Sequence, residues 1–497
     1  MTNTRMTQSE LESYLWGAAV LLRGLIDAGD YKGYIFPLVF LKRISDVWDE
    51  ERSDALALYE GDEDLASLPE NYRFTVPEGA HWEDIRNTST NVGRKLVSAM
   101  RAIETANPDT LAGVFGDAEW TNKDLLPDAT LTGLVEHFST RTLSLANLPE
   151  DELGNGYEYL IKRFADDSGH TAQEFYTNRT LVHLMARMLN AQPGESVYDP
   201  TCGTGGMLIS TAAEVKRQGK EHRSVKLYGQ ERNFTTAAIA KMNLFLHGIE
   251  DGHIAHGDTL AAPQLLDKDG KLRTFDVVLA NPPYSIKNWD RDAFTNDPFG
   301  RNIWGVPPQG RADYAFFQHI ASSMKPDTGR SVTLFPHGVT FRQEESALRE
   351  RLVKSGILEC VLGLGAGLFY NSPMEAVVVV LRANRPVDQQ GKVLFINAVD
   401  LVAREQAQSF LRPEHQQSIL DAYRGFKDID GLAHVASLGD IAENEYSLSI
   451  PLYVTTSEKA SVALSVEAAV DAWRESASSS SEAVSELLET LRSGAES

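Results

Sequence analysis

Residues 196–217 read SVYDPTCGTGGMLISTAAEVKR and divide into a strand, a turn and a helix. The apolar start predicts a strand over 196–198, and the run after the glycines predicts a helix over 206–217. The glycines allow a tight turn that approaches a ligand closely, and the helix start offers free N–H groups. Asp199 would repel a phosphate, and the Gly-x-x-x-x-Gly-Lys-Ser/Thr signature of phosphate loops is absent. The stretch favours a cationic ligand group such as an ammonium, although alone it also fits an ordinary strand-to-helix turn.

Strands alternate with helices on both sides of this unit. Such alternation predicts an α/β fold whose parallel sheet is covered by helices on both faces. In sheets of this kind ligands bind outside the carboxyl ends of the strands, so the residues at those ends are the candidates for a site. The expected helices lie at 180–189 and 234–247, and the expected strands lie at 225–230, 275–280, 330–335, 357–362 and 376–381.

Two more acidic residues follow the glycine-rich turn at a suggestive spacing. Glu231 lies 25 positions after Gly206, and Asp258 lies another 27 positions on. An acid at the end of the second strand, about 20 residues after such a turn, typically accepts hydrogen bonds from ribose hydroxyls. An acid at the next strand end could reach an adenine amine. Each carboxylate alone fits a helix cap or a solvated side chain, but three at successive strand ends favour ligand binding.

The tetrapeptide Asn281-Pro282-Pro283-Tyr284 follows the apolar strand expected over 275–280. The two prolines stiffen the backbone and remove two N–H donors. The Asn281 side-chain oxygen and the Pro282 carbonyl remain as acceptors, and Tyr284 adds a flat ring. Two acceptors beside an aromatic ring suit a planar amine, whose lone pair becomes available when both N–H bonds are accepted. The alternative for the isolated tetrapeptide is a rigid turn after a buried strand.

The segments that flank the α/β region read as helical. Residues 1–165 show apolar residues at helical spacing, with Pro37 placed near the first turn of a second helix. This part carries no catalytic constellation, and we expect a packing or partner-binding domain. Residues 456–497 hold two short helical patterns joined by a serine run, which predicts a docking tail or one packed on its own domain.

Composition fits a soluble globular protein of a reducing compartment. Of 497 residues, 42% are hydrophobic and 24% are charged, and only two are cysteines. Two distant cysteines exclude a disulfide scaffold and a cysteine-rich zinc site, so a cytoplasmic location is expected. No apolar run is long enough to span a bilayer and the first residues lack a secretory pattern, so no membrane association is expected.

The charge of the chain is strongly negative. The net charge is −23, of which residues 1–170 contribute −15 and residues 456–497 contribute −5. Such a chain is repelled by nucleic acid at long range, and it shows no paired zinc ligands or long basic stripe. A role on DNA would need a local basic surface in the middle of the chain or a basic partner. On charge alone, the simplest interpretation is a solvated acidic enzyme without a polymer partner.

Taken in order, these motifs resemble those of the amino-methyltransferases that use S-adenosylmethionine. The resemblance extends over residues 10–455 to one subfamily, the modification (methyltransferase) subunit of type I restriction–modification systems. Further matching segments are Leu15–Ala19 (LWGAA), Tyr31–Ser45, Gln173–Thr177 (QEFYT), Gly310–Phe316 (GRADYAF), Pro336–Val339 (PHGV), Gly367–Asn371 (GLFYN) and Asn444–Pro451 (NEYSLSIP).

The resemblance implies a Rossmann-like class I methyltransferase sheet with helical segments on either side. The implied domains are a helical N-terminal domain over 1–165, for subunit and DNA contacts, a methyltransferase domain over 166–455 and a helical tail over 456–497.

It also implies roles for individual residues. Asn281 and Pro282 would hold the target amine, Pro283 would stiffen the loop, and Tyr284 and Phe369 would stack on the target base. Asp199 would take the ammonium of the cofactor, Glu231 its ribose and Asp258 its adenine amine, and Thr177 would bond its carboxylate. The remaining cofactor-binding residues implied are Glu174, Phe175, Tyr176, Asn178, Gly203, Thr204 and Gly205.

The implied reaction is transfer of a methyl group from S-adenosylmethionine to the N6 amine of adenine in double-stranded DNA. The implied partners are a separate specificity subunit that reads the DNA, a second copy of this chain and a restriction endonuclease subunit. Three alternatives stay open on the residues alone: a cytosine-N4 methyltransferase, a protein glutamine methyltransferase and an inactive scaffold subunit that keeps the fold.

Overall fold

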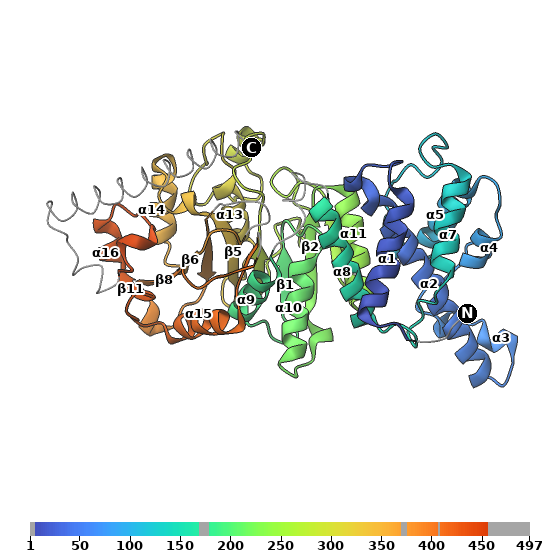
Figure 1. The fold of residues 1–497 in the computed structure, drawn as a ribbon. Helices are drawn as coiled ribbons and strands as arrows, with labels where there is room; N and C mark the ends of the chain where they lie inside the picture. The colour runs from blue at the N-terminus through green and yellow to red at the C-terminus, as the bar shows by residue number, and fades with distance from the viewer. Residues whose placement is uncertain (1–4, 168–177, 369–374, 406–407, 456–497) are drawn as a thin grey trace, which may run out of the picture.

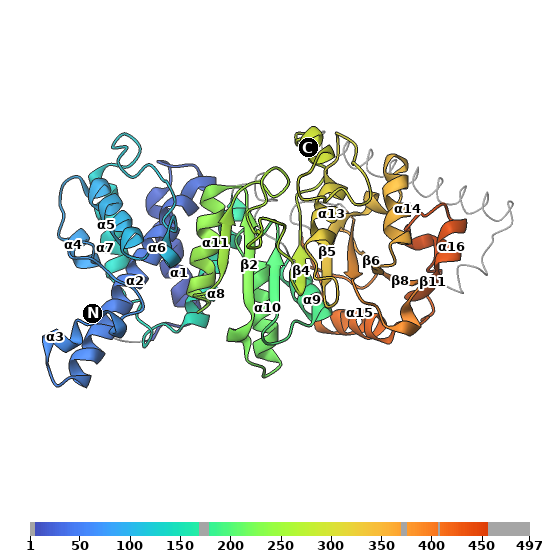
Figure 2. The ribbon, with the colours of Figure 1, turned by 180° about the vertical axis from the view of Figure 1, so that it is seen from behind.

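The computed structural model describes residues 5–167, 178–368, 375–405 and 408–455. A helical half and a sheet-containing half lie side by side along an elongated molecule (Figure 1, with the opposite side in Figure 2). Within the described residues, no helix combines the length and the apolar character that a membrane crossing requires.

The N-terminal half is helical, as the sequence predicts. Apart from the short α3, its helices share one apolar core, and α1 begins with a capping box in which Thr7 and Glu10 bond each other's backbone N–H groups. The helices are α1 (Gln8–Leu22), α2 (Tyr31–Leu58), α3 (Glu63–Ala66), α4 (Trp82–Arg86), α5 (Val92–Ala106), α6 (Pro108–Leu111), α7 (Asp128–Ser139) and α8 (Glu150–Asp167).

The position of Pro37 in α2 differs from the prediction. We expected it near the first turn, but a short 3-10 turn over Ala28–Asp30 leads directly into the helix, which begins at Tyr31. Pro37 therefore lies inside α2, where its missing N–H leaves one helical carbonyl without its usual donor.

The second half alternates strands and helices. The predicted helix over 206–217 is confirmed with the same bounds, and the other predicted helices and strands are present within one or two residues of their expected ends. The helices are α9 (Arg179–Leu189), α10 (Gly206–Arg217), α11 (Phe234–Leu246), α12 (Arg291–Thr295), α13 (Asp313–Ser322), α14 (Ser346–Lys354), α15 (Pro413–Gly425) and α16 (Leu438–Glu443). The strands are β1 (Ser196–Asp199), β2 (Lys226–Glu231), β3 (His253–His256), β4 (Val277–Ala280), β5 (Arg330–Pro336), β6 (Leu358–Leu364), β7 (Ala376–Arg382), β8 (Lys392–Ala398), β9 (Ala403–Glu405), β10 (Gln408–Phe410) and β11 (Ala433–Ser437).

Nine of these strands form one sheet, in the order β11-β8-β6-β7-β5-β4-β1-β2-β3. The prediction of a parallel sheet is wrong at two strands, because β7 runs antiparallel to β5 and β6, and β11 runs antiparallel to β8. The sequence between β6 and β7 is too short for a crossover helix, which a parallel neighbour requires. A strand was expected to end at Asp258, but no range was predicted for β3; strands β8 and β11 and the hairpin of β9 with β10 were not predicted.

Helix α11 belongs to both halves. Its residues Ile239, Met242 and Leu246 lie in the core of the N-terminal helices, whereas Ala240 and Leu244 lie in the core under the sheet. The two halves therefore share an element rather than meeting at a linker. The expected division at 165/166 falls inside α8, and we retain it, with the boundary at 455/456, as a prediction.

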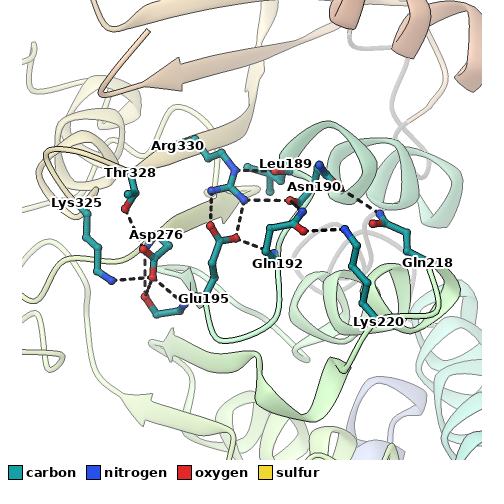
Figure 3. A network of polar contacts seen from close by, with 11 residues as sticks. Leu189, Asn190, Gln192, Glu195, Gln218, Lys220, Asp276, Lys325, Thr328 and Arg330 are labelled. Atoms are coloured by element: carbon teal, nitrogen blue, oxygen red, sulfur yellow. Dashed lines mark hydrogen bonds and ion pairs between the residues drawn. The ribbon is translucent and has the colours of Figure 1, made fainter. Parts of the chain in front are cut away.

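A polar network ties the starts of the strands together at the edge of the sheet away from the glycine-rich turn (Figure 3). Asp276, just before β4, accepts hydrogen bonds from the Ser196 N–H at 3.0 Å and from Lys325 Nζ at 2.8 Å. Arg330, the first residue of β5, donates to Glu195 at 2.7 Å and 3.0 Å. Paired in this way, the charges stabilise the register of β1, β4 and β5.

Candidate active site

The motif residues lie along one edge of the sheet. Asp199 and Glu231 are the last residues of β1 and β2, Asp258 follows β3 by two positions, and Asn281 directly follows β4. These four strands are parallel neighbours, and β1 lies between β2 and β4. The chain leaves β1 toward β2 on one side and later adds β4 on the other, so this is a topological switch point, where ligands bind in such sheets.

Asp199 is a buried carboxylate with few hydrogen bonds to offset the cost of burying its charge. It is 1% exposed, and its Oδ1 accepts the Thr201 N–H at 3.0 Å. Burial, together with the nearby Glu231 carboxylate, raises the pKa of Asp199 to about 7. Among the described residues, no basic side chain forms an ion pair with Asp199. The environment thus favours a bound cation beside this carboxylate, which fits an ammonium group.

The glycine-rich turn has no room for a larger residue at Gly205. Gly205 adopts φ +80°, and a Cβ there would lie 2.7 Å from Leu244 Cδ1 in α11. The Thr204 carbonyl accepts a hydrogen bond from Asn243 Nδ2 at 2.9 Å, also from α11. Gly203 also has a positive φ, of +53°, and its N–H points to Glu231. The turn is therefore fixed in a shape that leaves its backbone close to whatever binds over it.

Glu231 and Asp258 both hold turns with their carboxylates. Glu231 Oε2 accepts the Gly203 N–H at 3.0 Å, and its Oε1 accepts the Asn233 N–H at 2.8 Å. Asp258 Oδ1 accepts two N–H groups, and Arg232 Nε lies 3.5 Å from its Oδ2. These contacts orient both carboxylates at the carboxyl edge of the sheet.

The Asn281–Tyr284 segment forms a compact turn beyond β4. The Tyr284 hydroxyl donates to Asn281 Oδ1 at 2.7 Å, so the phenol contacts the oxygen that we expect to receive the target amine. Pro282 is buried and Pro283 is exposed. Burial, with a contribution from the Asp313 carboxylate, raises the pKa of Tyr284 well above its usual value, so the hydroxyl keeps its proton.

The structure describes one residue of the upstream cofactor motif. Asn178 caps α9: its Oδ1 accepts the Thr180 N–H at 3.0 Å, and its Nδ2 donates to the Ser409 carbonyl in β10 at 2.9 Å. The hairpin of β9 and β10 is thereby attached to the start of α9. Glu174, Phe175, Tyr176, Thr177 and Phe369 lie outside the described residues.

An arginine that sequence analysis did not single out supports the Asp258 turn. Arg301 is 1% exposed and donates to the carbonyls of Thr259 at 2.8 Å and Leu260 at 2.7 Å. Its charge is paired with Asp297, and its Nη1 lies 3.2 Å from His319 Nδ1. The segment after Tyr284 therefore folds back over the turn after β3. No sequence motif marks this arginine, because its partners are backbone carbonyls from a distant loop.

Two family profiles match the chain. The profile described as N-6 DNA Methylase matches residues 149–461, and that described as HsdM N-terminal domain matches residues 11–138.

Curated relatives match over most of their length. The MjaIX methylase subunit of a type I restriction enzyme from Methanocaldococcus jannaschii is 28% identical over 90% of this chain and 84% of its own. The MpnII methylase subunit of a type I restriction enzyme from Mycoplasma pneumoniae is 27% identical over 90% of this chain and 89% of its own.

A solved structure confirms the architecture. The type I restriction–modification system methyltransferase subunit from Streptococcus thermophilus superimposes with a TM-score of 0.77 at 30% identity, covering 90% of this chain and 100% of that one. The predicted fold, a class I methyltransferase sheet preceded by a helical region, is thereby confirmed. The chain belongs to the N-6 DNA methylase family, as a DNA adenine-N6 methyltransferase of the modification-subunit type.

Proposed function

We propose that the carboxyl edge of β1 to β4 binds S-adenosylmethionine and the target adenine side by side. The observation that carries the proposal is the placement of Asp199, Glu231 and Asp258 at the ends of adjacent parallel strands, with Asn281 at the end of the next one. Three carboxylates suit the ammonium, ribose and adenine amine of the cofactor. The amide oxygen suits a second amine, which is the substrate.

The cofactor residues have separate tasks in this proposal. Asp199 pairs with the ammonium, Glu231 accepts the ribose hydroxyls, Asp258 accepts the adenine amine, and the backbone of Gly203–Gly205 forms the floor. By resemblance, Glu174–Asn178 close over the methionine part, with Thr177 at its carboxylate. When bound, S-adenosylmethionine supplies a methyl group on a sulfonium sulfur, which is an activated leaving group.

The residues after β4 receive the base. Asn281 Oδ1 and the Pro282 carbonyl accept the two N–H bonds of the adenine amine, which frees the nitrogen lone pair. Tyr284 stacks on the base and offsets part of the few kcal/mol needed to take it out of the duplex. The hydroxyl of Tyr284 leaves Asn281 as the amine enters, so one hydrogen bond to the amide oxygen replaces another. By resemblance, Phe369 stacks on the opposite face.

We further infer that this chain acts on double-stranded DNA as part of an assembly. The net charge of −23 opposes long-range attraction to DNA, so another chain has to supply most of the phosphate contacts. The curated relatives are named as subunits of type I restriction enzymes. The proposed partners are a specificity subunit that reads the DNA, a second copy of this chain and a restriction endonuclease subunit.

The proposal is tested by measuring methylated bases in cellular DNA. The chain is expressed alone or with its co-encoded partner subunits, either unchanged or as Asn281→Ala, and purified DNA is digested and analysed by mass spectrometry. We expect N6-methyladenine only with the partners present, and its loss in Asn281→Ala. Calorimetry on the same variant should show cofactor affinity within about two-fold of the unchanged protein, because Asn281 does not face the proposed ammonium or ribose contacts.

Three results would contradict parts of the proposal. Methylation retained by Asn281→Ala would remove its assigned role. N4-methylcytosine in place of N6-methyladenine would keep the amine chemistry and change the base. Methylation by the chain without partners would contradict the inference that another subunit supplies the DNA contacts.

A further inference from the structure

The residue after Tyr284 has an unusual backbone conformation. Ser285 adopts φ +50°, in the left-handed region that non-glycine residues occupy rarely. This conformation turns the chain sharply after the Asn281–Tyr284 segment. A strained turn persists only where its surroundings hold it, and such turns cluster at functional sites.

Asp313 holds this turn. It is the first residue of α13 and is 1% exposed. Its Oδ1 accepts the Ser285 N–H at 2.7 Å, and its Oδ2 lies 3.4 Å from Ser285 Oγ. A carboxylate in the first turn of a helix is also favoured by the helix dipole.

Arg342 completes the arrangement from a third segment. Its Nη1 donates to Asp313 Oδ2 at 2.7 Å, and its Nη2 lies 3.5 Å from Ser285 Oγ. The side chain passes over Gly338, where a Cβ would lie 2.4 Å from Arg342 Nε. Arg349 donates to the Arg342 carbonyl at 2.7 Å and fixes its backbone. The Asp313 charge is therefore neutralised by a guanidinium that is itself held in place.

We propose that Asp313 and Arg342 are positioning residues that hold Tyr284 in the orientation needed to capture the target base. They contact the turn directly after Tyr284. Without them Ser285 can relax to the extended region, which displaces the ring from its place beside Asn281 Oδ1. The inference rests on the proposed role of Tyr284 in base stacking.

Asp313→Asn is the central test, in the enzyme assembled with its partner subunits. The amide keeps the shape of the side chain but presents an uncharged group to Arg342. We expect kcat for methylation to fall at least ten-fold with an unchanged KM for DNA, since the turn acts after DNA is bound. Cofactor affinity should stay unchanged, and a duplex with 2-aminopurine at the target position should give a smaller fluorescence increase.

Ser285→Gly should restore part of the activity lost in Asp313→Asn. Such a recovery is not expected if Asp313 only stabilises the fold in general. Glycine adopts a positive φ without strain, so the turn then depends less on Asp313. We expect Ser285→Gly alone to stay within about three-fold of the unchanged enzyme. The double variant Asp313→Asn/Ser285→Gly should recover several-fold of the kcat lost in Asp313→Asn.

Asp128→Asn is the matched control. Asp128 also begins a helix, accepts two N–H groups at the start of α5 and pairs with Lys123 at 3.1 Å, but it lies in the N-terminal half. The Asp128→Asn variant should leave kcat unchanged. An unaltered kcat in folded Asp313→Asn, or no recovery on adding Ser285→Gly, would overturn the positioning role. If the unchanged enzyme methylates DNA and Asn281→Ala does not, such a result leaves the proposed function intact.

Discussion

Asp199 shows how a binding residue can oppose stability. It is a buried carboxylate whose pKa is raised to about 7. Between the unfolded-state pKa and about 7, the unfolded chain ionises this carboxyl while the folded protein keeps it protonated, so folding stability falls as the pH rises through this range. A bound ammonium relieves this cost. The same carboxylate therefore weakens the free protein and strengthens the complex.

Two opposite effects are expected for Asp199→Asn. The amide can still accept the Thr201 N–H, and it carries no buried charge, so at pH 8 the free protein should gain up to about 4 kcal/mol of unfolding free energy, seen as a higher Tm. Affinity for S-adenosylhomocysteine, which carries the same ammonium, should fall at least ten-fold by calorimetry. In the unchanged protein this affinity should weaken as pH falls below 7, with proton release on binding; a pH-independent affinity would contradict the assignment.

At the scale of elements, the amino ends of the strands hold the sheet register through Asp276 (Figure 3). Burial acts to raise the pKa of this carboxyl, but hydrogen bonds from Lys325, Ser196 and Thr328 outweigh it and keep the pKa well below its usual range. Its stabilising contribution is therefore complete above the unfolded-state pKa and is lost as pH falls toward the folded-state pKa.

Asp276→Asn should lower the unfolding free energy by about 2–3 kcal/mol at pH 7, because it removes the charge-assisted bonds. In urea titrations at pH 7, 4 and 3, the difference from the unchanged protein should narrow by about 1 kcal/mol per pH unit below the unfolded-state pKa. Asp54→Asn, at an exposed position in α2, is the control and should change little. An equal difference at every pH would show that Asp276 does not act through its charge.

Elements with local signals were predictable from the sequence, and those set by distant contacts were not. The helix over 206–217 has an apolar repeat and a glycine start, and its bounds were predicted correctly. Strand β3 contains two histidines in four residues, so it shows no apolar run. The apolar run of β7 fits either strand direction, and its antiparallel pairing depends on the short connection from β6.

The residues of the site also divide into those that the sequence predicts and those that it does not. The motif residues Asp199, Glu231 and Asn281 were predictable because each stands at the end of a predicted strand, and Asp258 was predictable from its spacing after Glu231. The structure brings all four to one edge of the sheet. Their assigned roles stay predictions. The support from Arg301 and from the pair of Asp313 with Arg342 was not predicted, since those contacts join segments that only the folded chain brings together.

For the whole molecule, α11 is an element that joins the two halves through its packing in both cores. Its residue Phe245 packs edge-on against Phe40 of α2, with 5.1 Å between ring centroids, and against Phe74 at 4.9 Å. Glu231 lies just before the start of the same helix. Cofactor binding at Glu231 is therefore expected to reach the N-terminal helices through α11.

Hydrogen exchange can measure this connection. S-adenosylmethionine should slow amide exchange in α2 as well as around β1 and β2. Phe245→Ala should lower the unfolding free energy by about 3 kcal/mol and confine the protection to the sheet half. Leu58→Ala, at a position that is 72% exposed, should do neither. Protection of α2 that survives in Phe245→Ala would show that the connection does not run through α11.

A helix that is part of two cores also constrains how such a chain can evolve. If the halves met only at a linker, recombination in that linker could give the catalytic half a new N-terminal region. Here one face of α11 has to match the N-terminal helices and the other has to match the sheet. A foreign N-terminal region would leave Ile239, Met242 and Leu246 exposed, so the two halves are expected to be inherited together and to change in step.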